Sequence, residues 1–261
     1  MTFPPHIDPP TTEDVKGASG MARVAARDWE KYKARSTRIA DLVTSKISEF
    51  EVGTDASSNI LDWGSALGGA SIVLSERFDA TVYAADLDKH SMRWLSNNCP
   101  EIRTQALDPE GALPFVDGLF DLVFGISVFT HIPERLTKFY IDELARTIKP
   151  GGIMLQSFHG YHNVENVAKG PKEKGLYPSD VSSLKDAGVY FKSYSAEELS
   201  LMDFTSKTEY GIATHSKEYL LDAFGSHFGS ILEPQERPKR VPKRSQVAPR
   251  CPTWAPRCTQ S

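Results

Sequence analysis

A turn of small residues followed by a carboxylate is the clearest chemical signal in the sequence. Residues 60–69 read ILDWGSALGG, an apolar run that breaks into a turn whose small side chains let a ligand approach the backbone. The next apolar run ends at Asp86. A carboxylate at that place can accept hydrogen bonds from both ribose hydroxyls of a nucleoside-containing cofactor. The pattern therefore predicts a nucleoside-binding site.

Two cofactor classes use this arrangement, and two residues distinguish them. A dinucleotide site requires glycine at the position of Ala66, because the pyrophosphate contacts bare backbone there. Asp62 lies in the same turn, where its charge would repel a diphosphate and attract an ammonium or sulfonium group. We therefore expect Asp62 to face a cationic cofactor. The alternative is an NAD-dependent oxidoreductase of Rossmann type, because Gly64, Gly69 and Asp86 also suit a dinucleotide.

Three histidines follow predicted strands and are candidates for a catalytic base. His131 follows the fourth strand, and His159 and His162 follow the fifth. Histidine can accept a proton at neutral pH because its ordinary pKa lies near 6.5. Each of the three could instead anchor a loop by a hydrogen bond. His215, at the start of the last predicted helix, is expected to be structural.

The elements that must position these residues alternate between strands and helices. Short β-branched or apolar runs predict strands at 59–63, 81–85, 102–106, 121–127 and 152–157. Helices are expected at 70–77, 89–97 and 134–148, and a loop at 107–120. Strands separated by helices predict a mostly parallel sheet with helices on both faces. Ligands bind such α/β sheets at the carboxyl ends of the strands, which is where the candidate residues fall.

The segments outside this alternation define the predicted domain organisation. Residues 1–17 are rich in proline and poor in large apolar side chains, so we expect a mobile leader. Residues 18–233 form the predicted catalytic domain, beginning with one bent helix or two short helices over 18–50. Within it, residues 160–209 form a lid-like insertion whose aromatics, Tyr194 among them, could pack together or stack on an acceptor. Residues 234–261 are basic and rich in proline, and we expect them to be disordered.

The region 59–160 resembles the class I S-adenosylmethionine-dependent methyltransferases. The matching motifs are LDWGSALG at 61–68, the acid Asp86, LPF at 113–115 leading to FDLV at 120–123, and KPGG at 149–152. The run ISVFTHIPE at 126–134 is similar to a subgroup often found alongside glycosyltransferases. The resemblance implies a Rossmann-like methyltransferase fold with S-adenosyl-L-methionine as its cofactor.

The resemblance also assigns roles to the matching positions. It implies that Gly64, Ala66 and Gly68 hold the methionine end of the cofactor and that Asp86 holds the ribose. Ala66 replaces the common middle glycine of the motif. We expect the replacement to be tolerated, because the closest backbone approach is to a small amino-acid group.

Three further positions follow from the same resemblance. Leu87 would pack on the adenine ring, Asp108 would face the adenine amine, and Ser127 would lie near the sulfonium. The predicted reaction is methyl transfer to an oxygen, or as a second choice a nitrogen, of a small-molecule or sugar-containing acceptor. Alignment of donor and acceptor can lower the activation free energy of such a reaction by about 7–11 kcal/mol. A general base lowers it by roughly 3–5 kcal/mol, so alignment is the larger contribution.

The family sheet ends in an antiparallel strand, and the sequence shows no apolar run to form it after residue 233. Either the sheet is incomplete or another segment fills the gap. An incomplete sheet gives a further alternative, a degenerate, non-catalytic protein that binds the cofactor without turnover.

Composition excludes several other classes of protein. The formal net charge of −4 argues against an obligate nucleic-acid binder, and no stretch is long and apolar enough to cross a membrane. Three cysteines in 261 residues are too few and too unevenly spaced for a disulfide framework or a four-ligand zinc site. We therefore expect no metal, no membrane span and a cytoplasmic location.

Overall fold

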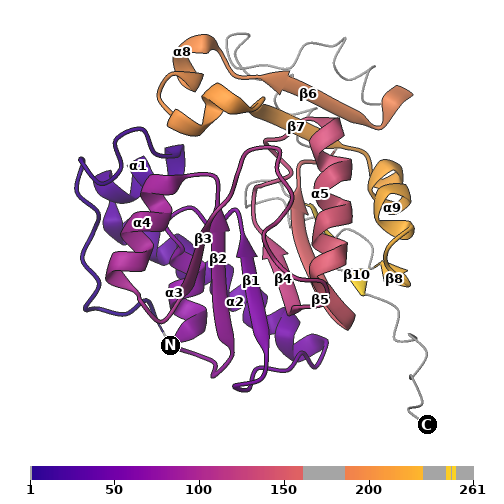
Figure 1. The fold of residues 1–261 in the computed structure, drawn as a ribbon, viewed down its shortest axis with the longest axis horizontal. Coiled ribbons are helices and arrows are strands. Elements are labelled where there is room, and N and C mark those ends of the chain that lie inside the picture. Colours follow the sequence, from indigo (N-terminus) through magenta and orange to yellow (C-terminus); the bar gives the residue numbers. More distant parts are fainter. Residues whose placement is uncertain (1, 161–185, 232–244, 248, 251–261) are drawn as a thin grey trace.

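The computed structural model describes residues 2–160, 186–231, 245–247 and 249–250 (Figure 1). A central sheet has the strand order β3-β2-β1-β4-β5-β10-β8, in which the first five strands run parallel. These five are β1 (Asn59–Trp63), β2 (Thr81–Asp86), β3 (Arg103–Ala106), β4 (Phe120–Gly125) and β5 (Ile148–Phe158). The Rossmann-like α/β class and every predicted parallel strand are confirmed, with strand ends within a few residues of the prediction.

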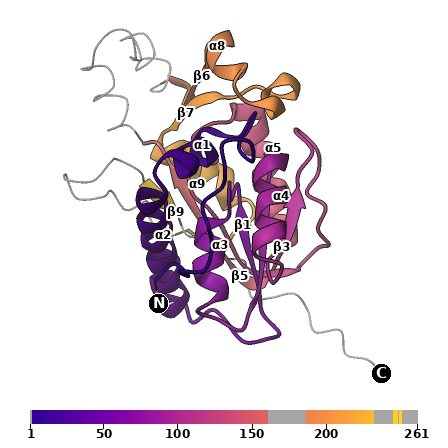
Figure 2. The same ribbon diagram turned by 90° about the vertical axis from the view of Figure 1, so that its left-hand side faces the viewer.

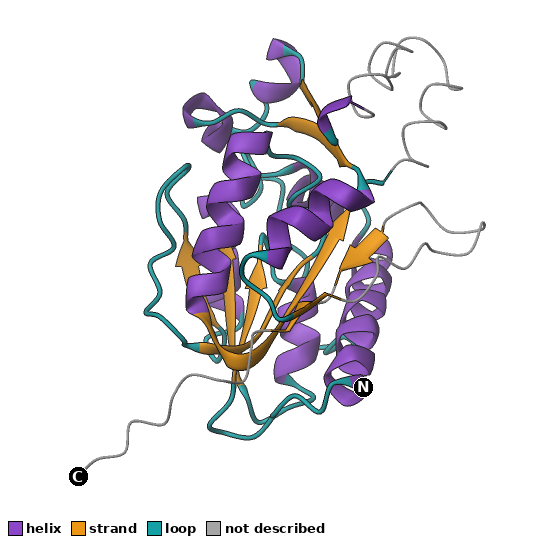
Figure 3. Cartoon of the chain, turned by 90° about the vertical axis from the view of Figure 1, so that its right-hand side faces the viewer, coloured by secondary structure: helices purple, strands orange, loops and turns teal. Residues whose placement is uncertain are grey.

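Helices cover both faces of the sheet because successive strand residues point to opposite sides. In β4, Leu122 packs into one buried cluster and its neighbour Val123 into the other. The first cluster lies under α1 (Gly20–Arg27), α2 (Trp29–Glu49), α3 (Gly69–Ser75) and α4 (Lys89–Asn98), seen in Figure 2. The second lies under α5 (Glu134–Thr147) and α9 (Lys217–Gly225), seen in Figure 3.

A separate antiparallel pair lies over the carboxyl ends of the parallel strands (Figure 1). It consists of β6 (Val189–Ser193) and β7 (Gly211–His215), with α8 (Ala196–Leu199) and the 3₁₀ helix η2 (Asp203–Lys207) between them. The amides of Gly211 and Ala213 donate to the carbonyls of His131 and Thr130, directly after β4. Strand β7 therefore belongs to this pair and not to the central sheet. Residues 161–185 of the predicted insertion lie outside the described residues, and a lid function stays a prediction.

The N-terminal segment differs from the mobile leader predicted over residues 1–17. Phe3, Ile7 and Val15 are at most 7% exposed, and the Phe3 ring packs edge-on against Trp29 at 5.3 Å. Prolines restrict the unfolded chain and so reduce the entropy lost on ordering. Three well-placed apolar side chains are then enough to anchor the segment on α2.

In the C-terminal segment, another stretch of chain fills the gap in the sheet, the second of the two alternatives, so residues 245–247 and 249–250 differ from the expected disordered tail. β9 (Ser245–Val247) and β10 (Pro249–Arg250) pair antiparallel with β5, and β10 also pairs with β8 (Ser230–Ile231). Strand pairing requires only backbone groups, and Pro249 stands at the first residue of β10, where a missing N–H is tolerated. The remainder of 234–261 lies outside the described residues. Within the part of the chain that the structure describes, no helix has the length and apolarity to cross a membrane.

Candidate active site

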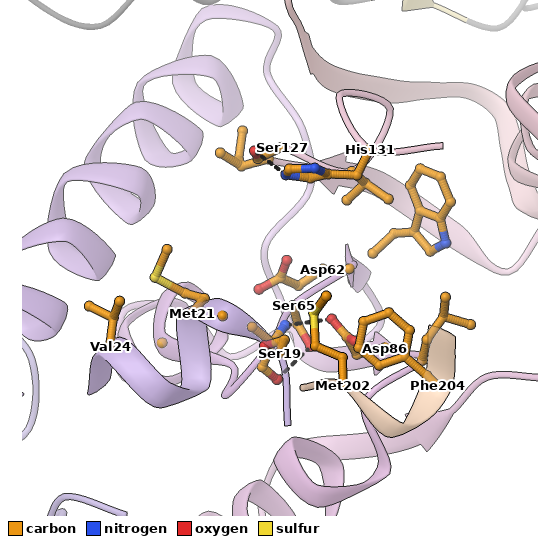
Figure 4. Close-up of a pocket in the computed structure, with 18 of the residues that line it drawn as sticks. Ser19, Met21, Val24, Asp62, Ser65, Asp86, Ser127, His131, Met202 and Phe204 are labelled. Atoms are coloured by element: carbon orange, nitrogen blue, oxygen red, sulfur yellow. Dashed lines mark hydrogen bonds between the residues drawn. The ribbon is translucent and has the colours of Figure 1, made fainter. Parts of the chain in front are cut away.

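A cavity of about 490 Å³ lies at the carboxyl ends of the parallel strands, between the sheet and the segments that cover it (Figure 4). Its volume is in the range of small-molecule and cofactor sites. Six of the predicted cofactor residues line it, namely Asp62, Gly64, Ala66, Asp86, Leu87 and Ser127. The histidine His131 lines it as well.

The turn after β1 holds the left-handed backbone that the small-residue motif predicts. Gly64, Ala66 and Gly68 have φ values of +73°, +50° and +68°. A Cβ atom on Gly64 would collide with the side chain of Val128, and one on Gly68 with Leu95. The two glycines are therefore required for close packing, whereas Ala66 adopts the left-handed conformation at a cost of roughly 1–2 kcal/mol.

Asp86 is fixed in place by the turn that it faces. Its two carboxylate oxygens accept the amides of Ala66 at 2.7 Å and Asp88 at 2.8 Å. A carboxylate oxygen has two lone pairs, so each can accept one further hydrogen bond, such as one from a ribose hydroxyl. Burial, with Asp88 nearby, raises the pKa of Asp86 to about 6. The site thus holds a rigid acceptor pair at the end of β2.

Asp62 supplies a second buried carboxyl group in the cavity. It is 4% exposed and accepts the hydroxyl of Ser71 at 2.7 Å. The pKa of Asp62 is raised to about 7, mainly by burial and also by the charge of Asp86. A cationic ligand beside these two carboxyl groups would favour their ionised forms.

The ring of His131 is oriented by hydrogen bonds from its Nδ1 side. Nδ1 lies 2.8 Å from the carbonyl oxygen of Gly211 and 3.2 Å from the hydroxyl of Tyr194. A carbonyl oxygen only accepts, so Nδ1 carries the proton in the neutral ring. Nε2 then keeps its lone pair, and it lies 3.5 Å from the Ser127 hydroxyl (Figure 4). The ring of Tyr210 stacks on the imidazole of His131, with the two ring centroids 5.0 Å apart.

Ser127 takes an unusual backbone conformation beside this histidine. Its φ is +72°, and its amide donates to the hydroxyl of Ser157 at 2.7 Å. Left-handed backbone at a residue other than glycine is strained, and such residues cluster at functional sites. The conformation places the Ser127 hydroxyl between Thr130 and His131 at the cavity wall.

Four predicted site residues have other positions. Asp108 is exposed and does not line the cavity, so the adenine contact predicted for it is not formed by this arrangement. Gly68 shapes the turn from outside the lining. His159 also lies outside the lining, where its Nδ1 is 3.2 Å from the carbonyl oxygen of Ala213. His162 lies outside the described residues.

Sequence reasoning missed most of the roof of the cavity. Met21 and Val24 of α1 form one side, and Met202 and Phe204 form another (Figure 4). These residues come from segments far apart in the chain, and their spacing carries no motif. The only available signal was the aromatic content of the insertion, which includes Tyr194.

Comparisons with known proteins agree with this geometry. Residues 60–152 match the family described as "Methyltransferase domain". The chain is 29% identical over 168 residues to Methyltransferase str3 of Strobilurus tenacellus, covering 63% of this chain and 58% of that protein. It is 30% identical over 100 residues to 2-methyl-6-phytyl-1,4-hydroquinone methyltransferase of Synechocystis sp., covering 38% of this chain and 31% of that protein. The chain thus spans less than two thirds of the length of either relative.

A solved structure shows the same fold. An S-adenosylmethionine-dependent methyltransferase from Clostridium acetobutylicum superposes with a TM-score of 0.57 at 14% identity, covering 82% of this chain and 90% of that chain. The fold similarity therefore extends beyond the 60–152 match. The subgroup suggested by residues 126–134 stays a prediction.

Proposed function

We propose that this chain, whose residues 60–152 match a methyltransferase domain, transfers a methyl group from S-adenosylmethionine to an oxygen of a small-molecule acceptor. One observation carries the proposal. The fixed carboxylate of Asp86 and the ring of His131, oriented by its Nδ1 hydrogen bond to Gly211, line the same cavity at the strand ends where such sheets bind ligands.

The residues present fit the cofactor. We assign the ribose to Asp86, whose free lone pairs can accept its hydroxyls, and the α-ammonium group to Asp62. Leu87 lines the cavity next to Asp86 and would contact the adenine ring. The left-handed turn leaves no side chain at Gly64, and its backbone can lie against the methionine end.

His131 is the residue that could move a proton. S-adenosylmethionine supplies, when bound, a methyl group whose bond to sulfur breaks as one to the acceptor forms, with the electron pair staying on sulfur. A hydroxyl must lose its proton in this reaction, and Nε2 of His131 has the lone pair to accept it. The carbonyl of Gly211 and the hydroxyl of Tyr194 would keep the resulting imidazolium oriented.

The oxygen acceptor is favoured by this base. An amine nitrogen attacks with a lone pair that is available before any proton leaves, so a base adds less to its reaction. Sugar hydroxyls and other alcohols or phenols remain in the proposed class. Of the alternatives, an NAD-dependent oxidoreductase lacks support, because the family match is to a methyltransferase domain and Asp62 would repel a diphosphate.

Two matched histidine variants test the proposal. We expect His131→Gln to lower methyl transfer from [methyl-³H]S-adenosylmethionine to extract acceptors by about 10²- to 10⁴-fold. His159→Gln should leave transfer within about twofold, because His159 lies outside the cavity lining. Both variants should bind S-adenosylhomocysteine like the unmodified protein. Loss of transfer only in His159→Gln would contradict the role of His131, and cofactor binding without any transfer would indicate a non-catalytic protein.

A further inference from the structure

The cavity has a mouth formed by two segments that are tied together. Arg23 of α1 donates to the carbonyl of Ala18 at 2.6 Å and to that of Leu201, in the segment after α8, at 2.7 Å. The amide of Asp203 also donates to the carbonyl of Gly17 at 2.9 Å. These bonds fix the distance between the α1 side and the facing segment, so the opening between them is built into the fold.

The mouth is lined by apolar side chains that remain in contact with solvent. Among the described residues, the large hydrophobic side chains classed as exposed are Val24 at 37%, Val116 at 68% and Leu201 at 54%. Two of these three, Val24 of α1 and Leu201 after α8, line the cavity. Behind them lie Met21 and Met202 (Figure 4). Exposed apolar side chains gathered at a pocket mark a binding surface.

Besides Asp62 and Asp86, the charged side chains that line the cavity are Arg23, Arg35 and Glu198, and two of them hold the shape of its mouth. The guanidinium of Arg23 bridges the two segments. Glu198 accepts the amide and hydroxyl of Ser195 in the capping box of α8. A polyhydroxylated ligand at the mouth would therefore meet methyl and methylene groups, and its hydroxyls would lose hydrogen bonds to water without replacement.

The cofactor does not account for this surface. Its predicted polar contacts, Asp62 and Asp86, lie at the strand ends, and Figure 4 shows Asp62 between the α1 side and the Ser127–His131 side of the cavity. Val24 and Leu201 lie at the rim, where they stay partly exposed. A second ligand that enters past them would cover their apolar surface and reach His131.

We propose that the acceptor is an apolar phenol, whose hydrocarbon body lies between Val24 and Leu201 and whose hydroxyl is directed toward Nε2 of His131. This inference rests on the proposed methyl transfer and narrows its acceptor. Binding is favoured because the hydrocarbon body of the ligand covers exposed apolar side chains. Catalysis is favoured because a phenolic hydroxyl loses its proton to a histidine more readily than an aliphatic hydroxyl does. A sugar acceptor gains neither advantage.

The test uses 2-naphthol as the apolar phenol and methyl β-D-glucopyranoside as the polar acceptor, both added to the full chain saturated with S-adenosylhomocysteine. Calorimetry and naphthol fluorescence measure binding. We expect 2-naphthol to bind more tightly than the glucoside and Leu201→Asn and Val24→Asn each to weaken naphthol binding by about tenfold. Val116→Asn removes a more exposed apolar side chain that lies outside this cavity lining, and naphthol binding should not change.

The outcomes separate this inference from the proposed function. Tighter binding of the glucoside, no binding of 2-naphthol, or equal binding by the Leu201 and Val116 variants would overturn the apolar acceptor. Tritium transfer to extract acceptors in the His131 experiment tests the methyltransferase activity separately. Naphthol binding that depends on Leu201, together with no transfer to any acceptor, would support the apolar site and refute the proposed reaction.

Discussion

Binding of the cofactor should release protons from the two buried carboxyl groups. In the free protein the pKa of Asp62 is raised to about 7 and that of Asp86 to about 6. At pH 6.5, about three quarters of the Asp62 groups and about one quarter of the Asp86 groups are then protonated. In the proposed complex, the α-ammonium group and the ribose hydroxyls would bind the ionised carboxylates. S-adenosylhomocysteine should therefore release about one proton at pH 6.5 and almost none at pH 8.5.

The same ionisation makes affinity depend on pH. If both carboxylates must ionise, the dissociation constant of S-adenosylhomocysteine should rise by up to about a thousandfold from pH 8 to pH 5. Isothermal titration calorimetry in buffers of different ionisation enthalpy measures both the affinity and the protons released. In Asp62→Asn the release at pH 6.5 should fall to about one quarter of a proton. A dissociation constant that is the same at pH 5 and pH 8, with no dependence on the buffer, would refute the reasoning.

Three substitutions test the turn and its carboxylate. Gly64→Ala should weaken binding of S-adenosylhomocysteine more than tenfold by calorimetry while circular dichroism stays unchanged, because the added Cβ collides with Val128; unchanged binding would contradict this packing. Ala66→Gly should stabilise the protein by up to about 1 kcal/mol in urea unfolding, since it relieves a φ of +50°, and destabilisation would count against the strain. Because the folded-state pKa of Asp62 lies above its unfolded value, stability falls as pH rises toward 7. Asp62→Asn should therefore raise Tm more at pH 8 than at pH 5, and an equal gain at both pH values would show that Asp62 is not destabilised by ionisation.

The sheet and the carboxylates could be predicted because their signals are local. Apolar runs separated by helix-length segments specify strands, and parallel connections place the end of each strand at one edge of the sheet. The positions of Asp62 and Asp86 at that edge could therefore be predicted. The same holds for His131, which lies in the loop after β4.

The rest of the site depends on contacts between distant segments. Strands β9 and β10 pair through their backbones, which leave no apolar pattern to read. The anchoring of Phe3 depends on a partner, Trp29, that proline content does not reveal. His159 follows a strand just as His131 does, but its ring bonds to Ala213 outside the cavity lining. Sequence places a residue near the strand edge, and tertiary packing decides whether its side chain enters the cavity.

The affinity of Asp86→Ala for S-adenosylhomocysteine tests most directly whether the cavity is a cofactor site. Removing the carboxylate deletes the acceptors for the ribose hydroxyls, so the dissociation constant at pH 8 should rise about 10- to 100-fold. Asp121→Ala is the matched control, because Asp121 lies near the opposite end of the sheet, paired with Lys149 at 2.8 Å. Its affinity should equal that of the unmodified protein. Equal affinities for Asp86→Ala and the unmodified protein would contradict the assignment of this cavity to the cofactor.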